Sequence, residues 1–251
     1  KTLVVIGLLM FAFVGYQLWG TGIQTARAQD RLSREFDEML AAQATAVTST
    51  VAPTTVAPTT SVGAAPTTVA PPTTVAPTTV PPATITAPAE GEAVARLEIA
   101  SIDFDWSVIE GVRSDDLANG PGHFPETPLP GQLGNSALAG HRTTHGAPFG
   151  RIAEIEVGDQ LVVTTLAGRF VYVVSGTLIV NPDEYGRVIP TVDATRATLT
   201  LTSCHPKWTT RQRYVVQAEL DVSLSDPVTA PAPVLPAPSD DQPADISLAP
   251  T

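Results

Sequence analysis

The single cysteine, Cys204, is the residue with the most distinctive chemistry in this chain. It closes the run ATLTLTSC and is followed by His205-Pro206. One cysteine cannot form an intramolecular disulfide, so this side chain is either buried and inert or a nucleophile. A nucleophilic thiol needs an acid/base partner that deprotonates it or protonates the leaving amine. The nucleophile hypothesis therefore depends on finding a suitable histidine.

Histidines at four positions are the candidates for this partner, namely His123, His141, His145 and His205. His205 adjoins Cys204, and neighbouring side chains in a strand point to opposite faces, so it is poorly placed. His141 and His145 lie in AGHRTTHGAPFG, residues 139–150, whose glycines and proline indicate a loop after a strand. Their spacing of four is found in helical HExxH zinc sites, but Arg142 stands where the glutamate belongs and the Gly/Pro context disfavours a helix.

An arginine is expected opposite the thiol. Alternation with period two places Cys204 on one strand face with Thr198, Thr200 and Thr202, and Pro206 ends the ladder. The next alternating run, residues 213–220, begins at Arg213 and is expected to pair antiparallel with the first. Cys204 and Arg213 would then face each other, where a guanidinium stabilises a thiolate or an oxyanion. The alternatives are an exposed surface arginine and the neighbouring Arg211.

The strands that position these residues form a mainly β core, residues 93–224. Short β-branched or alternating runs separated by Gly, Pro, Asn and Asp favour a sandwich or a closed barrel. The strands are expected at residues 96–99, 102–109, 136–139, 160–165, 170–180, 197–203 and 213–220. Single helical turns are expected near residues 115–117 and 149–155.

A transmembrane anchor is predicted at residues 1–24. Residues 3–19 carry no charge, Tyr16 and Trp19 suit an interfacial aromatic belt, and the length approaches that needed to cross a bilayer. Lys1 favours an inside N-terminus, which makes the protein a single-pass membrane protein with an extracellular core. The alternative is a signal peptide cleaved after Ala28, although the apolar run is long for one.

Three further segments flank the core. Residues 25–43 are expected to form a juxtamembrane amphipathic helix with Leu32, Phe36, Met39 and Leu40 on one stripe, packed on lipid, on a second copy or solvated. Residues 44–92 repeat VAPTT, which predicts a disordered, extended linker that holds the core away from the membrane. Residues 225–251 are predicted to be a disordered tail. The net charge of −11 disfavours nucleic-acid binding.

Three motifs in this order resemble the sortase family. They are NGPGHFPETPLPG at residues 119–131, GNSALAGHRTTHGAPF at residues 134–149, and TLTSCHP at residues 200–206, followed by Arg213. The pattern, which covers the core from residue 96 to residue 220, is most similar to class E sortases of actinobacteria. Ser203 stands where many members have threonine, which weakens the resemblance little.

The resemblance implies a closed eight-stranded sortase-type β-barrel with short helices, preceded by a transmembrane helix and a disordered linker. It implies His141, Cys204 and Arg213 as the catalytic residues. His123, Thr202 and Ser203 are candidate substrate contacts, with a structural role at a loop slightly favoured for His123. The resemblance also implies cleavage of a C-terminal sorting signal, LAxTG-like rather than LPxTG-like, between Thr and Gly. The acyl group would pass to the amine of a peptidoglycan precursor, and no cofactor or metal is expected.

Several other interpretations compete with this one. An L,D-transpeptidase carries a glycine and a Ser-His pair just before its cysteine, which Leu201-Thr202-Ser203 does not offer. A papain-like peptidase places its cysteine early and its histidine late, the reverse of the order here. A plain cysteine peptidase and a non-catalytic extracellular β-domain remain open, and the second predicts an unreactive Cys204.

Overall fold

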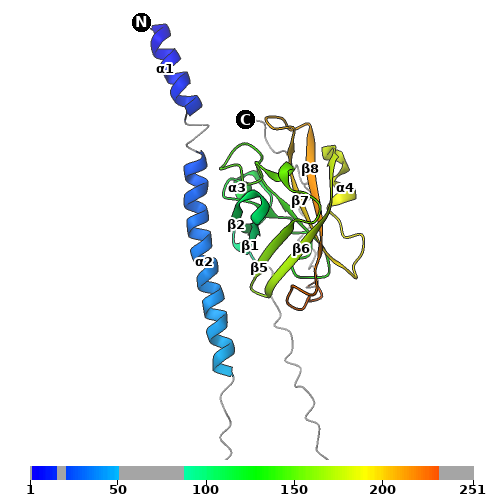
Figure 1. Ribbon diagram of the computed structural model, residues 1–251. Helices are drawn as coiled ribbons and strands as arrows, with labels where there is room; N and C mark the ends of the chain where they lie inside the picture. The colour runs from blue at the N-terminus through cyan, green and yellow to red at the C-terminus, as the bar shows by residue number, and fades with distance from the viewer. Residues whose placement is uncertain (1, 16–20, 51–87, 232–251) are drawn as a thin grey trace, which may run out of the picture.

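Eight strands close into a barrel in the computed structural model, which describes residues 2–15, 21–50 and 88–231 (Figure 1). The strands follow the order β1-β2-β3-β4-β7-β8-β6-β5 around the barrel. Their bounds are β1 Ala93–Ile99, β2 Phe104–Glu110, β3 Gly122–His123, β4 Gly134–Ala139, β5 Gln160–Thr165, β6 Gly168–Val180, β7 Ala197–His205 and β8 Gln212–Leu220. The prediction of a mainly β, closed barrel is confirmed.

Helices are short within the barrel domain and long only before it. The α-helices are α1 Thr2–Gly15, α2 Thr21–Thr50, α3 Ser114–Leu117 and α4 Tyr185–Val188. The 3-10 turns are η2 Ala100–Ile102, η3 Ile152–Glu154 and η4 Pro182–Glu184. The turns expected near residues 115–117 and 149–155 correspond to α3 and η3.

Strands β1, β4 and β6 begin two or three residues earlier than predicted, and two further differences have a clear physical reason. The strand expected at residues 102–109 begins only at Phe104, because η2 ends at Asp103 with a left-handed φ of 58°. The two-residue strand β3 was not predicted, since Gly122 and His123 have no apolar alternation of their own. It exists because β2 pairs with it in parallel and β4 pairs with it antiparallel.

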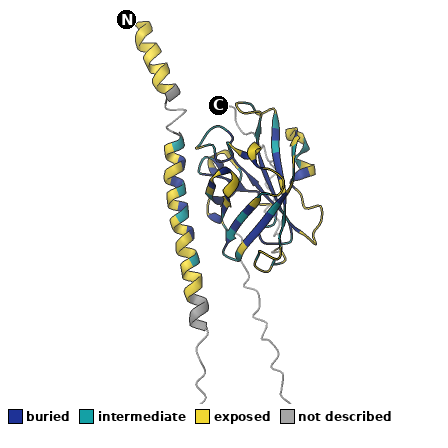
Figure 2. Cartoon of the chain, in the orientation of Figure 1, coloured by how far each residue is buried: buried dark blue, intermediate teal, exposed yellow. Residues whose placement is uncertain are grey.

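Strand β7 is buried on both faces, which makes it a rigid carrier for the residue at its end (Figure 2). Leu199 and Leu201 point into the main barrel core and are fully buried. On the opposite face, the Thr200 hydroxyl donates to the side chain of Asn135. The Asn135 amide in turn donates to the carbonyl of Ile189, which follows α4. The segment around α4 therefore covers the face of β7 that carries Cys204.

Helix α2 packs on the barrel. Leu32 and Phe36 are each only 1% exposed and form an apolar cluster with Ala93 of β1 and Ile109 of β2. The helix extends beyond residues 25–43 at both ends. The barrel covers Leu32 and Phe36 of its apolar stripe and part of Leu40, whereas Met39 is 37% exposed. The alternatives of lipid packing, pairing with a second copy and a solvated stalk are corrected accordingly, because the outer faces of β1 and β2 present a complementary apolar surface.

The membrane prediction is tested only in part. Within residues 2–15 and 21–50 and the rest of the described chain, no helix combines the length and the apolar character needed to span a membrane. Residues 1 and 16–20 of the predicted anchor lie outside the described residues.

Parts of the predicted linker and tail are structured. Residues 44–50 belong to α2, and Gly91 already donates to the carbonyl of Glu110. Residues 51–87 lie outside the described part. In the tail, the amide of Asp226 donates to the carbonyl of Arg169, and Thr229 exchanges backbone bonds with the segment around Gly131. Residues 225–229 therefore lie against the barrel, because Ser225 and Asp226 satisfy backbone groups of β6 and Thr229 satisfies those of the segment at residues 131–133.

Candidate active site

Cys204 and Arg213 lie directly opposite each other where β7 and β8 end. The antiparallel register pairs these two residues, so their side chains share one face of the hairpin, as predicted. Cys204 is partly exposed and Arg213 is only 3% exposed. The thiol is therefore accessible beside a buried guanidinium.

The guanidinium of Arg213 is fixed by three hydrogen bonds. Its Nε donates to the hydroxyl of Tyr185 at 3.0 Å, and its Nη1 donates to the carbonyls of Thr210 at 2.8 Å and Gln212 at 3.0 Å. The Cζ atom also lies 5.8 Å from the centre of the Tyr185 ring. A charge held this firmly needs little reorganisation when negative charge develops beside it.

The parallel pairing of β4 with β7 brings His141 to the same barrel edge. The amide of Gly140 donates to the carbonyl of Thr202, and the Ser203 hydroxyl donates to the carbonyl of Gly140 at 2.7 Å. Continuing this register places residue 141 level with residue 204. Gly140 is required because a Cβ there would lie 2.7 Å from the ring of Phe149. The strand order thus joins three segments that are distant in sequence.

Burial keeps both the thiol and the imidazole in their neutral forms. Burial raises the pKa of Cys204, while the charges of Arg213 and Arg142 lower it in part. Burial, and then the neighbouring His145, lower the pKa of His141 to about 4. The His141 ring stacks on His145 with centroids 4.6 Å apart. A neutral imidazole is able to accept the thiol proton and pass it on.

The Sortase domain family model matches residues 97–221, which is the barrel that this site closes. This chain belongs to the sortase family. Sortase D of Bacillus subtilis is similar, at 37% identity over 119 residues, which cover 47% of this chain and 58% of that protein. Sortase SrtE1 of Streptomyces coelicolor is 33% identical over 143 residues, covering 52% of this chain and 41% of that protein. This sortase therefore spans about half the length of these two curated relatives.

A solved structure agrees with the barrel assignment. The SrtF sortase from Corynebacterium diphtheriae has a TM-score of 0.53 and 28% identity to this sortase, covering 68% of this chain and 99% of that one. The likeness to SrtE1 accords with the class E resemblance of the motifs.

Two side chains near the thiol were not assigned a role from the sequence. Tyr185 bridges Arg213 and Thr202, with its hydroxyl 3.3 Å from the Thr202 hydroxyl. No local motif marks it, because α4 reaches the site only through the fold. Arg142 is 6% exposed, and its Cζ lies 5.8 Å from the Tyr214 ring centre. Its position next to His141 in the sequence could have indicated that Arg142 lies near the site.

The candidate substrate contacts His123, Thr202 and Ser203 are all buried, and their contact with a substrate stays a prediction. His123 is 1% exposed, with Nδ1 2.9 Å from the Glu110 carboxylate and Nε2 3.0 Å from the carbonyl of Pro128. Thr202 is 0% and Ser203 2% exposed, and their hydroxyls contact Tyr185 and Gly140 as described above. These side chains build the scaffold of the sortase site, because their polar atoms are already satisfied by protein.

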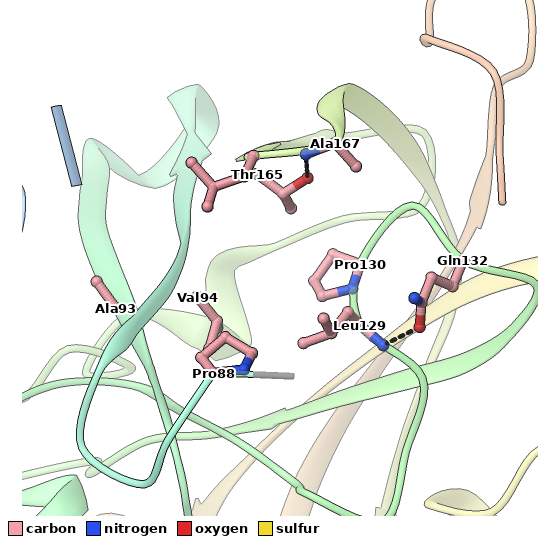
Figure 3. Close-up of a pocket in the computed structure, with 9 residues that line it drawn as sticks. Pro88, Ala93, Val94, Leu129, Pro130, Gln132, Thr165 and Ala167 are labelled. Atoms are coloured by element: carbon pink, nitrogen blue, oxygen red, sulfur yellow. Dashed lines mark hydrogen bonds between the residues drawn. The ribbon is translucent and has the colours of Figure 1, made fainter. Parts of the chain in front are cut away.

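An apolar groove lies apart from this site (Figure 3). It is lined by residues that include Ala93, Leu129, Pro130 and Ala167 and by none of the predicted catalytic residues. Among the residues that the structure describes, no group of three or more His, Cys, Asp and Glu side chains gathers as a metal site.

Proposed function

We propose that this sortase is a cysteine transpeptidase that cleaves a C-terminal sorting signal and transfers the acyl group to an amine. One observation carries the proposal. The accessible Cys204 is paired with a fixed Arg213, and the register of β4 with β7 places His141 at the same barrel edge. Nucleophile, cation and acid/base group are the three parts that acyl transfer by a thiol requires.

The first half of the reaction forms a thioester. The Cys204 sulfur attacks the threonine carbonyl of the signal, and His141 takes the thiol proton. The three bonds to Tyr185, Thr210 and Gln212 use Nε and Nη1 of Arg213 and leave Nη2 for the oxyanion. When the tetrahedral intermediate collapses, the C–N bond to glycine breaks and His141 protonates the departing amine.

The second half releases the product. An incoming amine attacks the thioester carbonyl and loses a proton to His141, a new amide bond forms, and Cys204 returns as the thiol. The acceptor is proposed to be the amine of a peptidoglycan precursor, and the signal an LAxTG-like sequence. The likeness to the Streptomyces sortase supports the class E preference.

The proposed location is the cell membrane, with one N-terminal span and the barrel outside the cell. The uncharged run at residues 3–19 and its flanking aromatic residues support this anchor. The α1 helix, Thr2–Gly15, agrees with the helical form that a span requires.

Peptide assays test this function. The protein is incubated with LAxTG and LPxTG peptides and a short amine, and the products are identified by mass spectrometry. The proposal predicts a transpeptidation product, preferentially from LAxTG. Hydrolysis without transfer would indicate a plain cysteine peptidase, and no reaction with either peptide would favour a non-catalytic domain.

Substitutions assign the roles. Cys204→Ala is expected to abolish cleavage, because no other side chain supplies the nucleophile. His141→Ala and Arg213→Ala are each expected to lower kcat/KM by about a hundredfold or more, the scale of losing a general acid or an oxyanion donor. Arg211→Ala, an exposed arginine two residues from Arg213, is the matched control and should retain activity.

A further inference from the structure

The loop that carries His141 contains a backbone turn that must be held in place. His145, Gly146 and Ala147 have positive φ values of 51°, 72° and 48°. Two of these residues have side chains that rarely adopt this conformation, which persists only when its surroundings enforce it. Because the His145 ring stacks on His141, the position of this turn sets the position of the acid/base group.

The first turns of α2 supply part of that enforcement. A Cβ built at Gly146 would lie 3.0 Å from the Trp106 ring and 3.7 Å from the methyl group of Thr25. A Cβ at Gly22 would lie 4.0 Å from the amide nitrogen of Gly146. The turn is therefore packed against β2 and the N-terminal end of α2.

Polar contacts fix this end of α2 to the barrel. The Gln29 amide donates to the carbonyls of Ser107 at 3.0 Å and Asn119 at 2.9 Å, and its oxygen accepts from the Ser107 amide at 2.8 Å. The hydroxyl of Thr25, which is fully buried, donates to the carbonyl of Ala118 at 2.8 Å. One glutamine side chain thus satisfies three backbone groups at the same place.

We infer that α2 is a positioning element of the active site, in which Thr25 and Gln29 hold the turn at residues 145–147 and thereby His141. The inference rests on the proposed function. It connects a helix outside the barrel to the acid/base group through Gly146 and His145. Thr25 and Gln29 contact backbone groups of the barrel, and Thr25 also contacts the turn, so both would act on His141 through the loop.

A matched pair of glutamines tests this inference in the full chain. Gln29→Ala removes three hydrogen bonds that fix α2 to Ser107 and Asn119, one helical turn beyond Thr25, which contacts the turn. Gln43→Ala removes one bond, to the carbonyl of Leu166, at the opposite end of the same helix. Gln29→Ala is expected to lower kcat by about tenfold to a hundredfold with KM nearly unchanged, since small misplacements of a catalytic group cost this much. Gln43→Ala is expected to retain the wild-type kcat.

A readout independent of turnover separates positioning from stability. The imidazole NMR signals of His141 and His145 are expected to shift in Gln29→Ala and to stay in place in Gln43→Ala, with Tm recorded for both. Equal kcat values for the two variants, or unshifted imidazole signals in Gln29→Ala, would overturn the inference. If the wild type itself shows no acyl transfer, the proposed function fails, while the NMR comparison still decides whether α2 positions the loop.

Discussion

At the scale of single residues, the Cys204 thiol is protonated and the His141 imidazole is neutral in the resting site. The pKa of Cys204 is raised by burial and that of His141 is lowered to about 4, so both groups are neutral at physiological pH. Arg213 and Arg142 each favour the thiolate, but burial outweighs them. In the proposed reaction, proton transfer from the thiol to the imidazole therefore occurs during catalysis and not in the resting protein.

The pH dependence of alkylation tests this protonation state. A thiol with a raised pKa is alkylated only as its thiolate, so the rate should climb about tenfold per pH unit from pH 6 to pH 8.5 without levelling off. Iodoacetamide labelling of Cys204, followed by mass spectrometry, measures the rate, with free cysteine as the reference. A plateau below pH 7 would show a thiolate at rest and contradict the assignment.

Tyr185 offers a second prediction at this scale. Tyr185→Phe removes the hydroxyl that accepts from Arg213 Nε and keeps the ring beneath the guanidinium. A hydrogen bond to a charged group contributes about 1.5–3 kcal/mol, so kcat/KM is expected to fall by roughly tenfold to a hundredfold. Tyr214→Phe, on the other face of β8, is the control. Steady-state kinetics that show equal losses for the two variants would argue against the bridge.

At the scale of elements, local sequence patterns predicted the strands β7 and β8 and their pairing, but not the elements that depend on contacts between distant residues. Alternation in β7 and β8 was enough to place Cys204 opposite Arg213, because an antiparallel hairpin fixes its own register. The two-residue strand β3 and the covering segment at α4 depend on contacts between distant residues. The period of α2 revealed its apolar stripe but not the surface that covers it, since amphipathicity does not identify a partner.

The contact of residues 225–229 with the barrel is open to a stability test. The carboxylate of Asp226 accepts a hydrogen bond from the amide of Arg169 at 2.7 Å. Asp226→Ala is expected to lower the free energy of unfolding by about 1 kcal/mol, the usual net contribution of one such bond. Denaturant titration measures it, with Asp183→Ala as the control at another exposed acidic position. No difference between the two variants would mean that this segment does not support β6.

At the scale of the whole molecule, the docking of α2 changes the role expected for the Pro/Thr-rich segment. That segment was predicted to hold the core away from the membrane. Because α2 begins at Thr21, within the predicted anchor segment 1–24, and packs on β1 and β2, the helix is proposed to connect the anchor to the barrel. The end of α2 nearer the anchor also lies at the loop of His141.

Changing the length of residues 51–87, or of the chain just before α2, tests which of these two segments connects the anchor to the barrel. Removing half of residues 51–87 should leave activity on a membrane-anchored substrate within about twofold, because the remaining residues, at about 3.3 Å each, still reach from α2 back to β1. Inserting the same number of Gly/Ser residues before Thr21 should lower that activity while sparing a soluble peptide. Activity in proteoliposomes measures both effects. Loss of activity in the shortened linker alone would contradict this view.

The most direct test of the account is capture of the acyl-enzyme. The protein is mixed with an LAxTG peptide in the absence of added amine, quenched in acid and analysed by intact mass and peptide mapping. The account predicts a mass gain equal to the peptide up to its threonine, located on Cys204 and absent from Cys204→Ala. Cleavage of the peptide without an adduct on the wild type, or cleavage by Cys204→Ala, would contradict it.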